Sequence, residues 1–144
     1  MNNKQKALSL PEAPKGKKGW PWTDVAQTEL TDKSALPKMT IVTPSLNQGL
    51  YLENTIRSVL LQGYPDLEYI VLDGGSSDNS VDIIKKYGDH ISYWHSKPDG
   101  GQAQAINRGF FLGKGRILAW LNSDDFYEPG ALICAAEHLQ KTKN

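Results

Sequence analysis

Short apolar runs alternate with stretches of helical periodicity along most of the chain. The runs have strand length and are rich in apolar and β-branched residues. They occupy Met39 to Thr43, about Glu68 to Leu72, Ile91 to His95 and Arg116 to Leu121. Apolar residues at helical spacing follow each run, at about Leu50 to Leu61, from near Asn79 to Gly88, from Gly101 to Gly113 and from Pro129 onward. The pattern predicts strands and helices in strict alternation.

This alternation is typical of an α/β domain. The runs have few polar interruptions, which favours strands buried on both faces in an open, mainly parallel sheet with helices on both faces. Pro44 is expected to end the first strand because proline cannot donate to a ladder. Trp120 and Cys134 are expected in the core. The predicted inward positions of the last three helices are Val81, Ile84 and Tyr87, then Ala103, Ile106 and Phe110, then Leu132, Ala136 and Leu139.

The first part of the chain has a different composition. Residues 1–37 are rich in Lys and Pro and show neither strand nor helix periodicity. This predicts an extended arm before a single domain at 38–144. The arm contains two indoles, Trp20 and Trp22, on either side of Pro21. Large aromatic side chains are costly to leave in water, so we expect the arm to fold against its own domain. A partner-binding motif is the alternative.

The overall composition narrows the classes of function. The chain has 144 residues, with 16 Lys plus Arg, 16 Asp plus Glu and formal net charge +0, so no positive excess favours nucleic acid as a partner. The single cysteine cannot form an internal disulfide or a cysteine metal cluster. No apolar run reaches the ~20 residues of a membrane span, and the polar start is unlike a signal peptide. We expect a soluble cytoplasmic protein, with peripheral contact at the inner face of the membrane left open.

Polar tips follow all four predicted strands. They are Thr43-Pro44-Ser45, Asp73-Gly74-Gly75-Ser76, Asp99-Gly100-Gly101-Gln102 and Asn122-Ser123-Asp124-Asp125. Because the carboxyl ends of parallel strands share one edge of a sheet, where ligands bind, we expect the tips to form one site. Glycines let the backbone approach a nucleotide, and carboxylates bind a base, a ribose or a metal. The signatures of dinucleotide-binding domains and P-loop NTPases do not occur.

Asp124 and Asp125 are the candidates for a metal site. Two adjacent carboxylates beside an apolar strand need a cation, a basic side chain or solvent to balance their charge. Hard oxygen ligands suit Mg²⁺ or Mn²⁺, with phosphate oxygens and water filling the other coordination positions. The alternative is that Asn122 to Asp125 is a turn that ends the strand, with Asp125 capping the next helix.

Five motifs occur in a fixed order between residue 39 and about residue 140. They are Thr40 to Asn47 (TIVTPSLN), Leu72 to Ser80 (LDGGSSDNS), Pro98 to Gln102 (PDGGQ), Asn107 to Gly109 (NRG) and Leu121 to Asp125 (LNSDD). Together they resemble the nucleotide-binding half of a family-2 glycosyltransferase with the Rossmann-like GT-A fold. The resemblance implies an enzyme of polysaccharide biosynthesis. Such an enzyme transfers a sugar from a nucleotide-diphosphate donor to an acceptor hydroxyl, with metal assistance and usually with inversion.

The resemblance also implies roles for the matched residues. Thr43 and Pro44 would line the nucleotide pocket, and Asp73 would contact a uracil-like base. Asp124 and Asp125 would be the metal end of a DxD-like acidic motif. The residues implied to bind the nucleotide sugar are Thr43, Pro44, Ser45, Asn47, Asp73, Gly75, Asp99, Gly100, Gly101, Gln102, Asn107, Arg108, Asn122, Ser123 and Asp124. For Arg108, a surface ion pair is the alternative to a phosphate contact.

Two positions depart from the family pattern. Asn122 stands where an aspartate is usual, and Gly74 replaces a frequent second aspartate. Asn122 can hydrogen-bond a ribose hydroxyl but carries no charge, so metal affinity would depend on the two carboxylates that follow it.

The catalytic base is not assigned by the matched motifs. In the family it comes from the half of the domain after the acidic motif, and this chain resembles a form truncated after that motif. Glu128 is expected at a helix start and Glu137 on a solvated helix face. Two hypotheses follow: a glycosyltransferase whose base and acceptor site lie elsewhere, or a non-catalytic nucleotide-binding or interaction module. The acceptor, a glycan or a lipid-linked saccharide, and the oligomeric state are left open.

Overall fold

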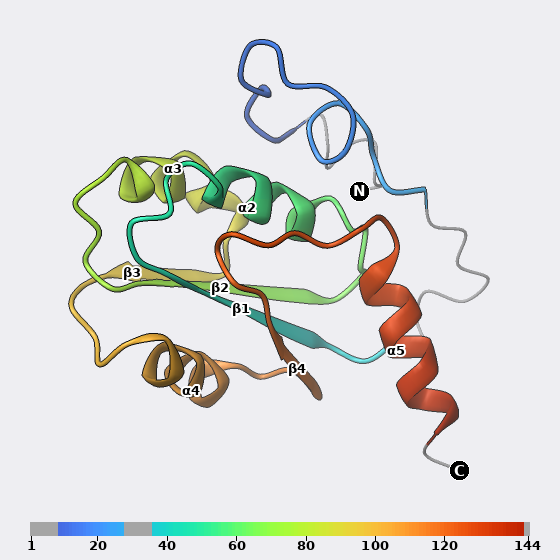
Figure 1. Ribbon diagram of the computed structural model, residues 1–144. Coiled ribbons are helices and arrows are strands. Elements are labelled where there is room, and N and C mark those ends of the chain that lie inside the picture. Colours follow the sequence, from blue (N-terminus) through green and yellow to red (C-terminus); the bar gives the residue numbers. More distant parts are fainter. Residues whose placement is uncertain (1–8, 28–35, 143–144) are drawn as a thin grey trace.

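The computed structural model describes residues 9–27 and 36–142. In this part of the chain, four parallel strands form a sheet in the order β3-β2-β1-β4 (Figure 1). The strands are β1 (Met39–Ser45), β2 (Leu67–Asp73), β3 (Tyr93–Ser96) and β4 (Ile117–Trp120). The helices are α2 (Leu52–Leu60), α3 (Ser80–Lys86), the 3-10 turn η2 (Gly88–His90), α4 (Gln102–Leu112) and α5 (Ala131–Lys141).

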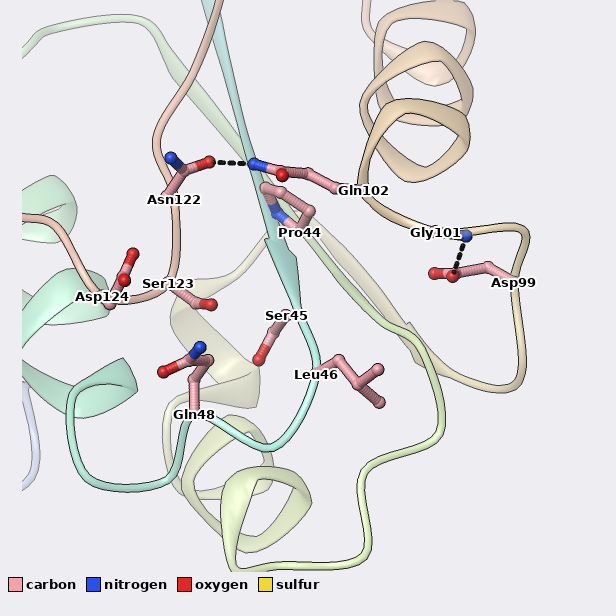
Figure 2. A pocket seen from close by; sticks show the side chains of 10 residues that line it. All are labelled: Pro44, Ser45, Leu46, Gln48, Asp99, Gly101, Gln102, Asn122, Ser123 and Asp124. Carbon is pink, nitrogen blue, oxygen red and sulfur yellow. Dashed lines mark hydrogen bonds between the residues drawn. The ribbon is translucent and has the colours of Figure 1, made fainter.

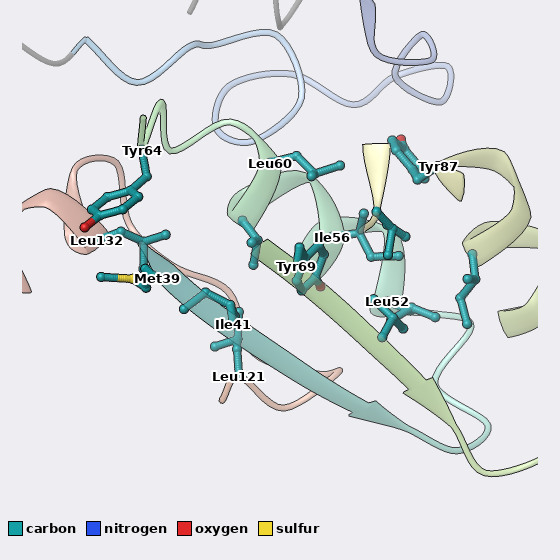
Figure 3. Packing of buried hydrophobic residues seen from close by; sticks show 14 of the residues in the cluster. Met39, Ile41, Leu52, Ile56, Leu60, Tyr64, Tyr69, Tyr87, Leu121 and Leu132 are labelled. Carbon is teal, nitrogen blue, oxygen red and sulfur yellow. The ribbon is translucent and has the colours of Figure 1, made fainter. Parts of the chain in front are cut away.

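Helices cover both faces of the sheet, which confirms the predicted α/β fold. α2 and α3 lie on one face and α4 on the other (Figure 1). On the α2 face, Leu52, Ile56 and Val59 are fully buried, and they pack in one cluster with Ile41 and Tyr69 of the sheet (Figure 3). Burying one such aliphatic side chain contributes about 1.5–3 kcal/mol. The cluster also takes in residues of α3 and α5, so it is the main core.

The prediction that Pro44 ends the first strand is wrong. β1 continues to Ser45, and Pro44 is paired with Leu72 of β2. The carbonyl of Val42 accepts from Leu121 on the β4 side, and the carbonyl of Ser45 accepts from Gly74 on the β2 side. Because successive residues of a strand point their backbone groups to alternate sides, the missing donor of Pro44 faces β4. The β4 pairing has already ended at Val42, so no ladder bond is lost.

The predicted inward face of α4 is correct only in part, since Phe110 packs against the smaller core cluster but Ala103 does not. The buried residues of this helix are Ala105 and Gly109, whereas Ala103 is exposed and Phe110 only half-buried. A Cβ atom on Gly109 would lie 2.4 Å from Val42 Cγ1, so the helix and β1 are too close for any side chain there. The smallest residues face the sheet because they allow this approach, and apolar periodicity alone does not reveal it.

The other differences concern exposure and element bounds. In α5, Leu132, Ile133 and Ala136 are buried, but Leu139 and Cys134 are exposed. In α3, Ile83 joins Ile84 in the core and Val81 is half-buried. β3 begins at Tyr93, two residues later than predicted.

The β4 strand is not buried on both faces. Ile117 and Ala119 pack against the main core, whereas Leu118 is 43% and Trp120 52% exposed. The prediction that Trp120 is a core residue is therefore wrong. β4 lies at the edge of the sheet, and α4 packs on β1 and β2 instead.

The described part of the arm, residues 9–27, packs against α2 through a buried arginine. Arg57 is 3% exposed and donates to the carbonyls of Pro11, Pro21 and Trp22 at 2.8–2.9 Å. The indole of Trp20 donates to the carbonyl of Tyr127 at 2.7 Å. The rest of the predicted arm, residues 1–8 and 28–35, lies outside the described residues. No helix of the described part is both long and apolar enough to cross a membrane.

Candidate functional site

A cavity of about 280 Å³ lies at the carboxyl ends of β1 and β4, beside the start of α4. Its lining comes from three of the four predicted tips (Figure 2). The lining residues are Pro44, Ser45, Leu46, Gln48, Asp99, Gly101, Gln102, Asn122, Ser123 and Asp124. The parallel sheet therefore brings polar groups from distant segments of the chain to one edge, as predicted.

The β1 tip supplies a buried hydroxyl that has no partner. Ser45 is 5% exposed, and its Oγ is the buried side-chain polar atom that lacks a hydrogen bond within the described residues. In Figure 2 this hydroxyl points into the space between the β1 and β4 tips. An unsatisfied buried hydroxyl costs about 1–3 kcal/mol. A ligand in the cavity could satisfy this hydroxyl and remove the cost.

The loop after β1 is held by the loop that precedes α3. The side-chain oxygen of Asn47 accepts from the backbone of Ser77 at 2.8 Å, and Asp78 accepts from Gly49 at 2.9 Å. A hydrogen bond from Ser80 lowers the pKa of Asp78, so the carboxylate of this clamp stays ionised at a lower pH than that of a free aspartate. The clamp positions Gln48 at the cavity wall. Asn47 thus organises the loop instead of lining the cavity.

The β4 tip forms a tight turn whose side chains diverge. The backbone of Asp125 donates to the carbonyl of Asn122 at 3.1 Å. Asp124 lines the cavity with an exposed carboxylate, whereas Asp125 does not line it, and the carbonyl of Asp125 accepts from Thr55. The alternative that Asp125 caps the next helix is wrong, because α5 begins at Ala131 with Gly130 as its cap. The two adjacent carboxylates are therefore not equivalent.

The tip before α4 forms the opposite wall. Asp99 accepts from the backbone of Gly101 at 2.9 Å, and Gly101 has φ 104°, a conformation that favours glycine. The side-chain amide of Gln102 donates to the side-chain oxygen of Asn122, which joins this wall to the β4 tip (Figure 2). A Cβ atom on Gly74 would already lie 3.2 Å from both carboxylate oxygens of Asp99. An aspartate at position 74 would place its carboxylate against the carboxylate of Asp99.

Asp73 is buried beneath the site and does not line the cavity. It is fully buried, and its carboxylate accepts four hydrogen bonds, from Gly75, twice from Ser76, and from Ser96. These bonds join the loop after β2 to the end of β3. Any contact between Asp73 and a base would compete with them, and the predicted base contact stays a prediction.

Several other predicted residues also lie outside the cavity lining. Thr43 is buried and bonded to the phenol of Tyr69, whose pKa is raised by burial. Arg108 is exposed, with its guanidinium 5.9 Å from the ring of Phe111. The remaining predicted residues outside the lining are Gly75, Gly100 and Asn107. Leu46 and Gln48 line the cavity but were not predicted from the sequence. They closely follow the predicted Ser45, and the conformation of the loop brings them to the cavity wall.

The donor set fits a metal only if a ligand contributes oxygens. Among the described residues, no group of three or more His, Cys, Asp and Glu side chains is arranged to hold a metal ion. The cavity lining offers the carboxylates of Asp99 and Asp124, together with amide and hydroxyl oxygens. Mg²⁺ and Mn²⁺ suit such a site, because Mg²⁺ commonly takes one or two carboxylates and completes its shell with phosphate oxygens and water.

Comparison with known proteins identifies the family. A family model described as glycosyl transferase family 2 matches residues 40–144. The chain belongs to glycosyltransferase family 2. An uncharacterized glycosyltransferase of Rickettsia typhi is 36% identical over 108 residues, which cover 75% of this chain and 34% of that protein. Chondroitin synthase of Pasteurella multocida is 36% identical over 108 residues, which cover 73% of this chain and 11% of that protein. The chain thus spans about a third or less of these relatives.

Solved structures of glycosyltransferases share the fold. S. aureus TarS 1–349 in complex with UDP-GlcNAc has a TM-score of 0.65 and 23% identity, and the match covers 72% of this chain and 31% of that chain. Mannosyltransferase PcManGT from Pyrobaculum calidifontis, in complex with GDP-Man and Mn²⁺, has a TM-score of 0.66 and 19% identity, and covers 97% of this chain and 38% of that chain. The GT-A fold and the resemblance to a glycosyltransferase are confirmed.

Proposed function

We propose that the cavity binds a nucleoside-diphosphate sugar together with Mg²⁺ or Mn²⁺, as the donor site of a glycosyltransferase. The two similar solved structures are complexes with UDP-GlcNAc and with GDP-Man and Mn²⁺, respectively. The observation in this chain that carries the proposal is the unpartnered Ser45 hydroxyl. It faces a cavity that also contains the carboxylate of Asp124. Such a cavity suits a ligand rich in hydroxyl groups, and the carboxylates of Asp99 and Asp124 suit a divalent cation that would offset the negative charge of a diphosphate.

Each wall of the cavity has a distinct part in this proposal. Asp124 would hold the metal, which would offset the negative charge that develops on the departing diphosphate. Gln102 and Asn122 present amide groups suited to the hydroxyls of a ribose or a sugar, and their mutual hydrogen bond fixes both side chains. The transfer is proposed to invert the sugar configuration, as is usual in the family. Neither Glu128 nor Glu137 lines the cavity, so neither is proposed as its general base.

Nucleotide binding tests the donor site. Calorimetric titration with UDP and with GDP, each with Mn²⁺ and again with excess chelator, should show metal-dependent binding to the wild-type chain. Asp124→Asn should weaken the nucleotide by at least about tenfold, because it removes the charged metal ligand. Asp82→Asn is the matched control, since Asp82 is an exposed carboxylate on α3, away from the cavity lining. Equal affinities for the two variants would overturn the assignment of Asp124.

Ser45→Ala separates binding from folding. Removing a buried hydroxyl that has no partner should leave stability unchanged or raise it by about 1 kcal/mol. The same change should weaken nucleotide binding by about threefold to tenfold, because the ligand loses one hydrogen bond. Thermal unfolding without ligand measures the first effect, and titration measures the second. A variant that is destabilised yet binds normally would contradict the role given to Ser45.

Turnover distinguishes a transferase from a non-catalytic module. Release of UDP or GDP from the corresponding nucleotide sugar, measured with Mn²⁺ present, reports hydrolysis or transfer by this chain. Release that disappears in Asp124→Asn supports the transferase. Intact nucleotide binding without any release supports the nucleotide-binding module.

A further inference from the structure

A second hollow, of about 400 Å³, lies between the arm and the start of α2. Four aromatic rings contribute to its lining: Trp20 and Trp22 from the arm, Tyr51 from the turn before α2, and Phe126 from the loop after β4. Its volume falls in the range of small-molecule pockets, about 300–1,000 Å³. None of its lining residues is shared with the donor cavity. We call it the arm groove.

The arm side of the groove is held in place by hydrogen bonds to the domain. Trp20 donates from its indole to Tyr127 at 2.7 Å, and the buried Arg57 donates to the carbonyl of Trp22 at 2.9 Å. The guanidinium of Arg57 also lies 5.7 Å from the centre of the Trp22 ring. These contacts already order the arm in the absence of a ligand. Ligand binding would therefore cost little conformational entropy in the arm.

The opposite side of the groove exposes aromatic surface that the fold does not use. Tyr51 is 53% and Phe126 46% exposed, yet neither belongs to a core cluster. The charged side chains of the lining are Lys17 and Glu53, and Glu53 already forms an ion pair with Lys86. Aromatic rings with a few polar groups suit a ligand with apolar C–H faces and hydroxyl edges, as in a pyranose. The lining offers one lysine, which lies over the Trp22 ring, and not the basic cluster that an anionic lipid surface requires, so a neutral saccharide is favoured.

The groove and the donor cavity adjoin each other along two shared loops. Gln48 lines the cavity and the next residue, Gly49, lines the groove. Asp124 lines the cavity, and Phe126 lines the groove two residues later. Consecutive Cα atoms are about 3.8 Å apart, so the walls of the two hollows are within about 8 Å of each other on both loops. A ligand in the groove would therefore contact the two loops that also form walls of the donor cavity.

We propose that the arm groove binds a neutral saccharide unit of the acceptor, with Tyr51 and Phe126 as stacking residues. The assignment of this saccharide as the acceptor depends on the donor function proposed above. The arm, which lies outside the residues matched by the family model, would then contribute to acceptor recognition.

Ligand-observed NMR tests the groove directly. The probes are the methyl glycosides of glucose, galactose, mannose and N-acetylglucosamine at millimolar concentration, with the full chain as receptor. At least one probe should show saturation transfer from the wild-type protein. Tyr51→Ala and Phe126→Ala should each weaken that probe by about fivefold, because each removes one exposed stacking ring. Phe111→Ala is the matched control: Phe111 is 81% exposed and lies on α4, across the sheet from α2 (Figure 1).

The outcomes separate this proposal from the donor function. Asp124→Asn should weaken nucleotide binding by at least about tenfold and leave the saccharide signal unchanged. Nucleotide binding without any saccharide signal would overturn the groove assignment alone. A saccharide signal without nucleotide binding would overturn its role as an acceptor site. The groove assignment would also be overturned if the saccharide signal were lost in Phe111→Ala but kept in the groove variants. Binding to anionic vesicles in place of all four glycosides would overturn it as well.

Discussion

The two faces of the sheet differ in how completely this chain covers them. On one face, α2, α3 and α5 pack with the sheet into a large cluster, and the arm covers α2 in turn. On the other face, α4 is the one helix of residues 9–27 and 36–142 that packs against the sheet, and the buried cluster there consists of Val42, Ile70, Leu72 and Ala105. Leu118 and Trp120 of β4 remain exposed on that side. One helix that lies close to β1 and β2 is too narrow to cover β4 as well.

This difference shows where the stability of the donor cavity arises. Ile41 of β1 and Leu121, the residue directly after β4, pack into the large cluster just before the tips that line the cavity. The wall formed by α4 depends instead on close approach of its backbone to β1 at Gly109. We therefore expect the two faces to respond differently to substitution.

The largest effect is expected from a void created in the large cluster. Ile56 is fully buried between α2 and the sheet, so Ile56→Ala should lower the free energy of unfolding by about 2–5 kcal/mol. Denaturant titration measures this loss. A cost below about 1 kcal/mol would mean that the α2 face is packed more loosely than the structure shows.

The next effect concerns the link between the arm and α2. Arg57→Leu removes the donor to three arm carbonyls and should cost about 1.5–3 kcal/mol, because charged hydrogen bonds are lost. Hydrogen exchange should then speed up for the amides of the arm more than for those of β1. Lys86→Leu is the control, since Lys86 makes an exposed ion pair with Glu53 and should change stability by less than about 1 kcal/mol. Unchanged exchange in the arm would contradict its attachment through Arg57.

A smaller effect is expected where α4 touches β1. Gly109→Ala places a Cβ atom against Val42 and should cost about 1–3 kcal/mol, although alanine favours helices. The cavity wall should shift with the helix, so nucleotide affinity should fall together with stability, as measured by thermal unfolding and titration. Gln104→Ala is the control, since Gln104 is exposed on the same helix and its replacement should be nearly neutral. A stabilised Gly109→Ala variant would show that α4 is not held against β1.

The smallest effect is expected on the exposed part of β4. Trp120 is 52% exposed, so Trp120→Ser should change stability by no more than about 0.5–1 kcal/mol. Its ring centre lies 6.3 Å from that of Phe110, which is the contact that the substitution removes. Thermal unfolding compares this variant with Ile56→Ala. Similar losses for the two variants would remove the contrast between the faces.

Much of the fold and part of the site could be predicted from the pattern of residues. Four strands were placed correctly to within a few residues, because parallel strands buried by helices have a strong apolar signal. The faces of α4 and α5 were predicted only in part: Leu132 and Ala136 are buried as expected, but Leu139 and Ala103 are exposed. The face of α4 depends on how closely Gly109 approaches Val42, and the exposure of Leu139 depends on how far the core extends along α5. Neither is a property of one segment alone.

By itself, the sequence determined that small residues, carboxylates or both follow each strand of a parallel sheet, and hence that they meet at one edge. Only the tertiary structure decided which of these groups are available to a ligand. Asp73 is turned inward because Ser76 and Ser96 satisfy its carboxylate, whereas Ser45 is left without a partner at the cavity. The physical reason is that hydrogen-bond partners come from loops far apart in the chain, so their pairing exists only after the strands have assembled.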